Sequence, residues 1–313
     1  MTHRVSIIIP TFRRWNFLIE AIESVFHQTY RDWEIIIVND GGGSPEGKII
    51  NFLNEPKIRY IEHQDNMGIA SARNTGISKS SGEFIAYLDD DDIFYPNHLE
   101  MLISEMLKNN LVFAYTDSYK GSYVGSNGNY KLIKKEVRYS RNFDRKNLWK
   151  ANFIPTLCVC HHRDCLSLPG GFDPSLKVLE DWNMWLKMSL HYTFHHIPRI
   201  TAEYRVRLDQ TNTTQRTSDD IWKKATVQIY HNSLNDPNIT QNSTHEKYLK
   251  KGIAKFIRKN DRWISRELRG DDLKSSLEEM FSTLSFHEWM TMLFLHPLSF
   301  IRLRVMLNRN SII

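Results

Sequence analysis

Residues 82–92 read GEFIAYLDDDD, in which five apolar residues lead directly into four aspartates. A short apolar run between a glycine and a polar block is typical of a buried strand. Four adjacent carboxylates repel one another, so this ending makes sense mainly if a cation lies among them. A solvated acidic turn before a helix near Pro96 is the alternative. The position at the carboxyl end of a strand, where ligands bind in open α/β sheets, favours a binding site.

Strands and helices alternate on the N-terminal side of this stretch. Residues 5–9 and 34–38 are apolar except for Ser6 and Glu34, and apolar residues recur at helical spacing from Phe17 to Phe26 between them. Continuous apolar strands joined through a helix indicate a right-handed parallel crossover with both faces of the sheet covered. The sequence therefore predicts an α/β fold with a mostly parallel twisted sheet flanked by helices.

The composition is that of an ordinary globular protein. The chain has 313 residues, of which 41% are hydrophobic and 25% charged, with a net charge of +5. This length suits one elaborated domain of roughly 200–250 residues with an extension. We find no signal-peptide pattern and no apolar run of about 18 residues, so we expect a cytoplasmic protein without a conventional membrane span. We expect no nucleic-acid partner.

Three cysteines, Cys158, Cys160 and Cys165, lie close to a His-His pair at residues 161–162 and raise the question of a zinc site. No second pair of ligands follows at the spacing of a zinc finger. We therefore favour a strand over residues 156–160, in which Cys158 and Cys160 face one side as small apolar groups.

Four short sequence motifs occur in an order and spacing that together point to one family. They are SIIIPTF at residues 6–12, VNDGG at 38–42, the stretch from NMG at 66–68 through ARN at 72–74 to the aspartates, and GGFD at 170–173 followed by EDW at 180–182. Together they resemble the inverting family-2 glycosyltransferases with the GT-A fold, over residues 4 to 206. The resemblance implies a nucleotide-diphosphate sugar donor, with a UDP-sugar favoured, and a divalent metal, Mn²⁺ or Mg²⁺. It also implies a hydroxyl of a glycan or lipid-linked molecule as the acceptor.

The resemblance assigns the donor site to residues at the ends of the strands. Pro10, Thr11 and Phe12 would line the nucleoside pocket. Asp40 would accept a hydrogen bond from the base, although a simple turn is the alternative for this position. Arg73 would face the diphosphate, where its guanidinium supplies a charge-assisted fork, and a surface arginine is the alternative.

The metal site follows from the same resemblance. Asp89 and Asp91 match the two acids of the family's Asp-x-Asp motif, so Asp91 is expected to bind the metal directly. Asp89 would reach the ribose, or the metal through water. Because Asp90 and Asp92 are acidic too, the assignment is open by one residue, and we include Asp90 among the donor-binding residues.

Inversion by a single displacement needs a carboxylate that removes the proton of the acceptor hydroxyl. Asp181 occupies the family's position for this base, at a helix start where the helix dipole favours the ionised form. Glu180 is the second candidate, and an ordinary acid in the first turn of a helix is the non-catalytic alternative. Relatives often carry a His shortly after a Tyr-Arg pair; Arg207 stands there in this chain, and we assign it no role.

The chain changes character after residue 115. Residues 121–130 are rich in Gly, Ser, Asn and Tyr, which predicts a turn or mobile loop. We expect three parts, namely a nucleotide-sugar-binding half (1–115), an acceptor-binding half (116–218) and a helical basic C-terminal extension (219–313).

The extension offers two interpretations. Residues 246–270 carry nine Lys or Arg against three acids, and residues 286–307 mix large apolar residues with His and Arg. Residues 240–313 would then contact the inner face of a membrane peripherally, where a lipid-linked acceptor would be found. Helices that pack on the catalytic domain, or on a second subunit of a homodimer, are the alternative that we favour slightly.

Two other functions share parts of this pattern. A sugar-nucleotide nucleotidyltransferase shares the sheet topology but usually has a Gly-rich loop after its first strand, which residues 10–12 lack. A non-catalytic module that binds nucleotides or glycans would be expected to have lost the metal acids or the base. We therefore favour a non-processive glycosyltransferase of polysaccharide biosynthesis.

Overall fold

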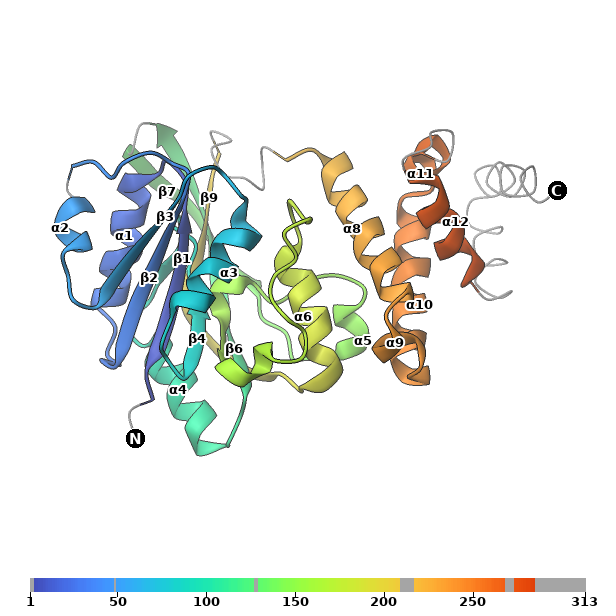
Figure 1. Ribbon diagram of the computed structural model, residues 1–313, viewed down its shortest axis with the longest axis horizontal. Coiled ribbons are helices and arrows are strands. Elements are labelled where there is room, and N and C mark those ends of the chain that lie inside the picture. Colours follow the sequence, from blue (N-terminus) through green and yellow to red (C-terminus); the bar gives the residue numbers. More distant parts are fainter. Residues whose placement is uncertain (1–2, 48, 127–128, 209–216, 268–272, 285–313) are drawn as a thin grey trace. The chain divides into compact units, whose positions relative to one another are not determined.

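The computed structural model describes residues 3–47, 49–126, 129–208, 217–267 and 273–284 (Figure 1). The chain forms two compact units, one of residues 1–143 with 153–218 and one of residues 144–152 with 219–313. The chain therefore enters the second unit briefly before its C-terminal part. The functional division of residues 1–218 into a donor half and an acceptor half stays a prediction.

The described part of the first unit contains one sheet. Its strands are β1 (Val5–Thr11), β2 (Trp33–Asp40), β3 (Ile58–His63), β4 (Phe84–Tyr87), β5 (Ile93–Phe94), β6 (Phe113–Ser126), β7 (Asn129–Tyr139), β8 (Val159–His162) and β9 (His195–Arg207). They lie in the order β3-β2-β1-β4-β8-β6-β9-β5, and β7 pairs with β6 outside this path. β1 to β4 pair in parallel, whereas β8 runs antiparallel to both β4 and β6. The predicted α/β fold is confirmed, with parallel pairing concentrated in the N-terminal half.

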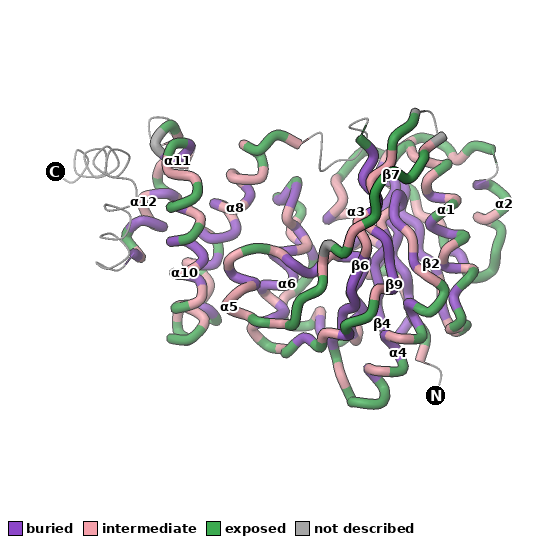
Figure 2. Tube along the Cα trace, turned by 180° about the vertical axis from the view of Figure 1, so that it is seen from behind, coloured by how far each residue is buried: buried purple, intermediate pink, exposed green. Residues whose placement is uncertain are grey.

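Helices cover this sheet because each presents an apolar face to it. They are α1 (Trp15–Phe26), α2 (Ile49–Leu53), α3 (Ile69–Lys79), α4 (His98–Lys108) and α6 (Glu180–His191). All seven residues of β1 are buried, as expected for a strand covered on both faces. Figure 2 shows buried backbone in purple through the centre of the sheet, for example along much of β6. α3 approaches the sheet closely at Gly76, where an added Cβ would lie 2.5 Å from Ile8 Cγ2.

The loop expected over residues 121–130 is wrong for most of its length. β6 continues to Ser126 and β7 begins at Asn129, so these residues belong to a hairpin, while residues 127–128 lie outside the described part. β6 pairs with β9 on one side and with β7 on the other. Two ladders of backbone hydrogen bonds outweigh the low strand propensity of Gly and Ser. At Gly121 an added Cβ would lie 2.8 Å from Tyr123 Cε2 and closer still to the Glu203 carboxylate, so a larger residue would have to displace these side chains.

The strand expected over residues 156–160 begins later. Thr156–Cys158 form a turn of 3₁₀ helix after Pro155, and β8 starts at Val159. All three cysteines are buried free thiols, and burial raises the pKa of Cys158 to about 12.

The second unit is helical, as predicted for the extension. Its helices are α5 (Arg145–Leu148), α8 (Asp219–Leu234), α9 (Pro237–Thr240), α10 (Ser243–Lys259), α11 (Asp261–Glu267) and α12 (Lys274–Ser282). Trp149 is fully buried, and its carbonyl accepts a 2.8 Å hydrogen bond from the Tyr230 hydroxyl. Gly252 of α10 faces the same carbonyl and leaves no room for a Cβ.

None of the described helices is both long and apolar enough to cross a bilayer. The apolar tail of residues 286–307 lies outside the described residues, so the expectations for it stay predictions.

Candidate active site

The parallel strands bring three predicted site residues to one edge of the sheet. Thr11 ends β1, Asp40 ends β2, and the acidic run follows β4 after Leu88. The carboxyl ends of adjacent parallel strands share an edge, which is where ligands bind in α/β sheets. Thr11 lies against the acidic run, since its hydroxyl donates a 2.7 Å hydrogen bond to Asp90 Oδ2.

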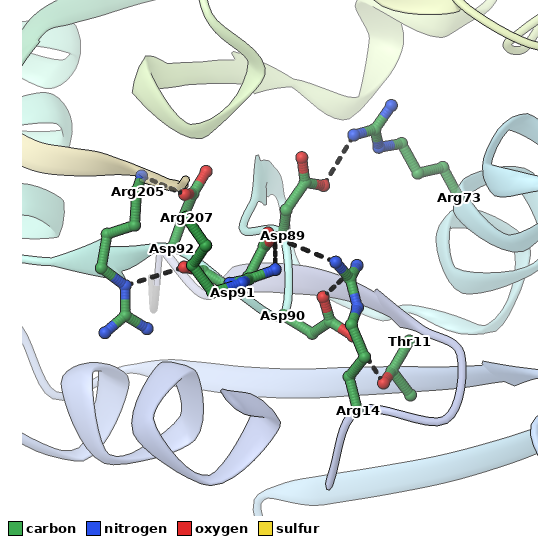
Figure 3. A network of polar contacts seen from close by, with 9 residues as sticks. All are labelled: Thr11, Arg14, Arg73, Asp89, Asp90, Asp91, Asp92, Arg205 and Arg207. Carbon is green, nitrogen blue, oxygen red and sulfur yellow. Dashed lines mark hydrogen bonds and ion pairs between the residues drawn. The ribbon is translucent and has the colours of Figure 1, made fainter. Parts of the chain in front are cut away.

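Arginines from separate elements meet the acidic run (Figure 3). Asp89 Oδ1 lies 2.7 Å from Nη2 of Arg73. Arg14 reaches both oxygens of Asp90, with Nη2 at 2.5 Å from Oδ1 and Nε at 3.1 Å from Oδ2. The same arginine extends Nη1 to Asp91 Oδ2 at 2.9 Å. Positive charge for three of the four aspartates is therefore supplied by the protein.

Strand β9 supplies the remaining partners. Nη2 of Arg207 lies 2.8 Å from Asp91 Oδ2, so this single oxygen contacts two guanidinium groups. Asp92 Oδ1 accepts a 2.8 Å hydrogen bond from the backbone N–H of Arg205, whose Nε donates to the carbonyl of Asp91 at 2.7 Å. The four aspartates thus point in different directions, and each has a positive or hydrogen-bonding partner.

Burial controls the charge of two of these acids. Burial raises the pKa of Asp90 to about 7, against the opposing pull of Arg14. Burial, with the negative charge of Asp91, raises the pKa of Asp92 well above its ordinary value. The pKa of Arg14 is raised because Asp90 and Asp91 favour its charge more strongly than burial disfavours it.

Arg73 is a buried residue that joins two parts of the site. It lies on α3 with 1% of its surface exposed, so the alternative of a surface arginine is wrong. Besides Asp89, it contacts Glu180 through Nη1, at 2.5 Å from Oε1. Its guanidinium carbon lies 5.3 Å from the centre of the Phe172 ring. Arg73 therefore links the acidic run after β4 with the start of α6.

The two candidate bases stand in the first turn of α6. Asp181 Oδ1 accepts a 2.6 Å hydrogen bond from the backbone N–H of Trp182, and Oδ2 accepts one of 3.1 Å from the Thr156 hydroxyl. Burial raises the pKa of Asp181 and raises that of Glu180 to about 7, although Arg73 opposes both shifts. Leu179, just before the helix, adopts a left-handed backbone with φ of 62°. Residues other than glycine rarely adopt this backbone conformation, so it marks a turn that the surrounding structure imposes.

Asp40 is more than a turn residue. Its carboxylate accepts hydrogen bonds from the backbone N–H groups of Met67 at 2.9 Å and Gly68 at 2.8 Å. Asp40 Oδ1 also lies 2.7 Å from Nδ1 of His63. These contacts fix the loop that enters α3. Beside it, Pro10 is buried within β1, whereas the Phe12 ring is 38% exposed.

Sequence reasoning missed three residues of this site. Arg14 follows the first strand, but no spacing rule links it to acids that lie more than seventy residues later. Thr156 gave no signal, because a lone threonine before an apolar run is common. Arg207 was noted only as a departure from the family pattern, and its ion pair with Asp91 becomes visible in the fold.

Comparison with known proteins gives the family of this site. The family described as Glycosyl transferase family 2 matches residues 6–165, which include most of β1 and the whole acidic run. A relative from Escherichia coli, named UDP-Glc:alpha-D-GlcNAc-diphosphoundecaprenol beta-1,3-glucosyltransferase WfgD, is 38% identical over 185 residues, covering 59% of this chain and 69% of that protein.

Two further comparisons concern length and fold. An uncharacterized glycosyltransferase of Rickettsia bellii is 32% identical over 216 residues, which cover 66% of this chain but only 29% of the relative. Crystallised S. aureus TarS 1-349 in complex with UDP-GlcNAc has a TM-score of 0.70 and 13% identity, covering 97% of this chain and 90% of that one. The fold is therefore that of GT-A glycosyltransferases. Because this family matches residues 6–165, the chain belongs to glycosyl transferase family 2.

Proposed function

We propose that the protein transfers a sugar from a nucleotide-diphosphate sugar to a hydroxyl group, with inversion at the anomeric carbon. The observation that carries this proposal is the position of Arg73 between Asp89 and Glu180. A donor bound at the acidic run and an acceptor bound beside the start of α6 would then meet at one place. Family membership supports this function over the alternative of a sugar-nucleotide nucleotidyltransferase.

The donor would bind at the edge formed by β1, β2 and β4. Pro10, Thr11 and Phe12 would surround the nucleoside, and the exposed Phe12 ring offers a face for stacking. Asp40 would accept a hydrogen bond from the nucleobase. Its carboxylate keeps a lone pair for this bond, because the backbone N–H groups of Met67 and Gly68 do not use all of them. A uridine nucleotide is the best candidate, because the relative WfgD is named for a UDP-Glc donor.

A divalent ion fits the type of ligand at this site. Carboxylate oxygens of Asp91 and Asp89 are the ligands that Mn²⁺ and Mg²⁺ prefer. No group of three or more His, Cys, Asp or Glu side chains suited to hold a metal occurs in the described part of the chain. Asp91, with Asp89 as its partner, would therefore hold the ion together with the donor phosphates. When bound, the ion would neutralise charge that develops on the departing nucleoside diphosphate.

Asp181 would act as the base. Its two oxygens are oriented by Trp182 N–H and by the Thr156 hydroxyl, so the carboxylate is held in place before the acceptor arrives. The raised pKa of Asp181 makes its ionised form a stronger proton acceptor than an exposed aspartate. In the single displacement, the acceptor oxygen forms the new bond to the anomeric carbon as the bond to the diphosphate breaks. The proton of the acceptor hydroxyl passes to Asp181.

Glu180 would serve a different purpose. It is buried and bound to Arg73, which leaves it in a position to hold the guanidinium rather than to reach an acceptor. Arg73 would then contact the diphosphate from a fixed position. Glu180 remains the second candidate for the base.

Donor screening with a product analysis tests this proposal. Purified protein with Mn²⁺ is challenged with a panel of UDP- and GDP-sugars, and the midpoint of thermal unfolding is recorded. A cognate donor at 100 times its dissociation constant should add about 2.7 kcal/mol of stability. The donor that binds is then incubated with acceptors, including a diphosphate-linked N-acetylglucosamine, and the anomeric configuration of the product is read by NMR. Retained configuration, or no transfer from any donor that binds, would reject the proposal.

The second unit would bring the enzyme to a lipid-linked acceptor. α10 buries Leu249, Ile253 and Ile257 on one face. The opposite face exposes Lys247, Lys255, Arg258 and Lys259. A basic helical face is attracted to anionic lipid, by about 1 kcal/mol per residue near the surface. The acceptor named for the relative WfgD is lipid-linked, which supports a peripheral membrane contact.

Vesicle binding distinguishes this contact from the alternative of packing on a second subunit. Replacing Lys247, Lys255, Arg258 and Lys259 by Gln should abolish sedimentation with vesicles that contain anionic lipid. Neutral vesicles serve as the control for the lipid charge. Unchanged sedimentation of the variant would reject α10 as the contact, and a dimer of the wild-type protein in solution would favour the alternative.

A further inference from the structure

Arg207 places a buried positive charge against Asp91. Its Nη2 lies 2.8 Å from Asp91 Oδ2, and only 2% of its side chain is exposed. Its guanidinium carbon lies 4.0 Å from the centre of the Phe17 ring and 5.9 Å from that of Tyr130. The two rings also contact each other, with 5.5 Å between their centres. Arg207 is therefore held by the carboxylate and by two aromatic side chains at once.

The other arginine on Asp91 is held less firmly. Arg14 lies in the loop after β1 and has 27% of its side chain exposed. It also divides its contacts between Asp90 and Asp91. A change in this loop can withdraw Arg14, whereas Arg207 ends a strand of the sheet and is enclosed. Of the two guanidinium groups that contact Asp91, that of Arg207 is therefore the more firmly held in place.

A divalent ion bound to Asp91 would lie close to the positive charge of Arg207. Like charges at short range repel more strongly where protein replaces water. The guanidinium also neutralises the carboxylate that would attract the ion. A nucleotide diphosphate brings negative charge of its own, which offsets the repulsion between the ion and the arginines.

We propose that Arg207 excludes free divalent cations from Asp91, so that the ion enters only together with a nucleotide diphosphate. The inference rests on the proposed role of Asp91 as metal ligand. Arg207 then sets the order in which the ligands bind. The enzyme accepts the metal–nucleotide complex rather than the free metal ion. The free enzyme then keeps its acidic site paired with arginine rather than with metal.

Titration with Mn²⁺ tests the inference without any turnover. The EPR signal of unbound Mn²⁺ is followed for the wild type, Arg207→Gln and Arg207→Lys, each with and without UDP. UDP should tighten Mn²⁺ binding by the wild type at least tenfold. Arg207→Gln should bind Mn²⁺ without UDP at least tenfold more tightly than the wild type, whereas Arg207→Lys, which keeps the charge, should not.

Two controls identify the site of the ion. Arg199→Gln removes an exposed charge from the same strand, β9, and should bind Mn²⁺ like the wild type. Adding Asp91→Asn to Arg207→Gln should remove the binding that the single variant gains. If the double variant keeps this binding, the ion lies elsewhere and the inference is wrong.

The remaining outcomes separate the inference from the proposed function. Equal Mn²⁺ affinity of the wild type with and without UDP overturns the inference, even if Arg207→Gln fails to fold. Unchanged affinity in a folded Arg207→Gln overturns it as well. Failure of the wild type to bind Mn²⁺ even with UDP rejects the metal role of Asp91 and, with it, the inference. Calorimetric titration of the protein with UDP in the presence of a chelator then shows whether the proposed donor site binds the nucleotide without metal.

Discussion

The hydroxyl of Thr156 donates a 3.1 Å hydrogen bond to Oδ2 of Asp181. This contact joins the turn before β8 to the first turn of α6, two segments that are far apart in sequence. It orients one oxygen of the proposed base, while Trp182 N–H orients the other. The base is therefore positioned by the protein before any acceptor binds.

Removing the base should have a much larger effect than removing its partner. We expect Asp181→Asn to lower kcat by roughly 10²–10⁴, the usual contribution of a general base. Thr156→Val, which keeps the shape but not the hydroxyl, should lower kcat by about tenfold, corresponding to about 1.4 kcal/mol. Initial rates with saturating donor measure both. Donor affinity is the control and should stay near the wild-type value, and full turnover by Asp181→Asn would transfer the role to another group.

Loss of the metal should mimic loss of its ligand. We expect wild-type enzyme in excess chelator, and Asp91→Asn with Mn²⁺, to lose transfer because both remove the proposed compensation of the leaving group's charge. Asp91→Asn should also lose the Mn²⁺-dependent part of donor binding, whereas Asp181→Asn should keep it. Calorimetric donor titrations with and without Mn²⁺ make the comparison, and undiminished transfer in chelator would rule out a metal requirement.

The contributions of Arg73 and Glu180 to the free energy of unfolding should depend on each other. Breaking a buried ion pair by removing one partner typically costs about 3–5 kcal/mol, since the other charge is left unpaired. We expect Arg73→Met to be strongly destabilising, and Glu180→Gln in the same background to cost much less than it does alone. Denaturant unfolding of both single variants and the double variant completes the cycle. Additive losses would show that the two side chains do not interact.

Transfer should lose rate in acid at a higher pH than an exposed aspartate would require. The pKa of Asp181 is raised by burial, and only its ionised form can accept the acceptor's proton. We therefore expect kcat to fall as the pH is lowered through a value above the ordinary aspartate range. The pH profile of kcat measures this, with Glu180→Gln as a comparison for the contribution of the neighbouring acid. A flat profile down to pH 4 would contradict the shift.

The unliganded protein should lose stability as the pH rises toward neutrality. The pKa of Asp90 and that of Glu180 are each raised by burial to about 7, above the ordinary carboxyl value near 4. Their protonated forms stabilise the fold below the ordinary value, and this contribution is lost as the pH rises through about 7. Thermal unfolding between pH 4 and 8 should show the decline, and Asp90→Asn should flatten it. A midpoint that rises over this interval would contradict the sign.

The sequence predicted the strands β1, β2 and β4, the helix α1 and the helical character of the second unit, but neither β7 nor the long strand β9. Continuous apolar runs such as that of β1 gave the parallel half of the sheet, because such strands need cover on both faces. The same reasoning failed at residues 121–130, where local propensity suggested a loop and pairing with β9 produced a long strand.

The candidate site was predictable in its acids but not in their partners. The local pattern drew attention to the acidic run at a strand end, and the family resemblance then selected Asp89, Asp91 and Asp181. Arg14 reaches Asp91 from the loop after β1 and Arg207 reaches it from the end of β9, and contacts over such separations depend on the register of the whole sheet. A single sequence carries no signal for them.

Residues 144–152 belong to the same compact unit as the C-terminal helices, where the carbonyl of Trp149 contacts the Tyr230 hydroxyl and lies against Gly252. Cutting the gene after residue 218 would thus remove the hydrogen-bond partner of this carbonyl from a segment in which the Trp149 side chain is fully buried. The extension is not a detachable module that can be exchanged between homologues as a cassette. A graft of the C-terminal helices therefore has to carry residues 144–152 as well.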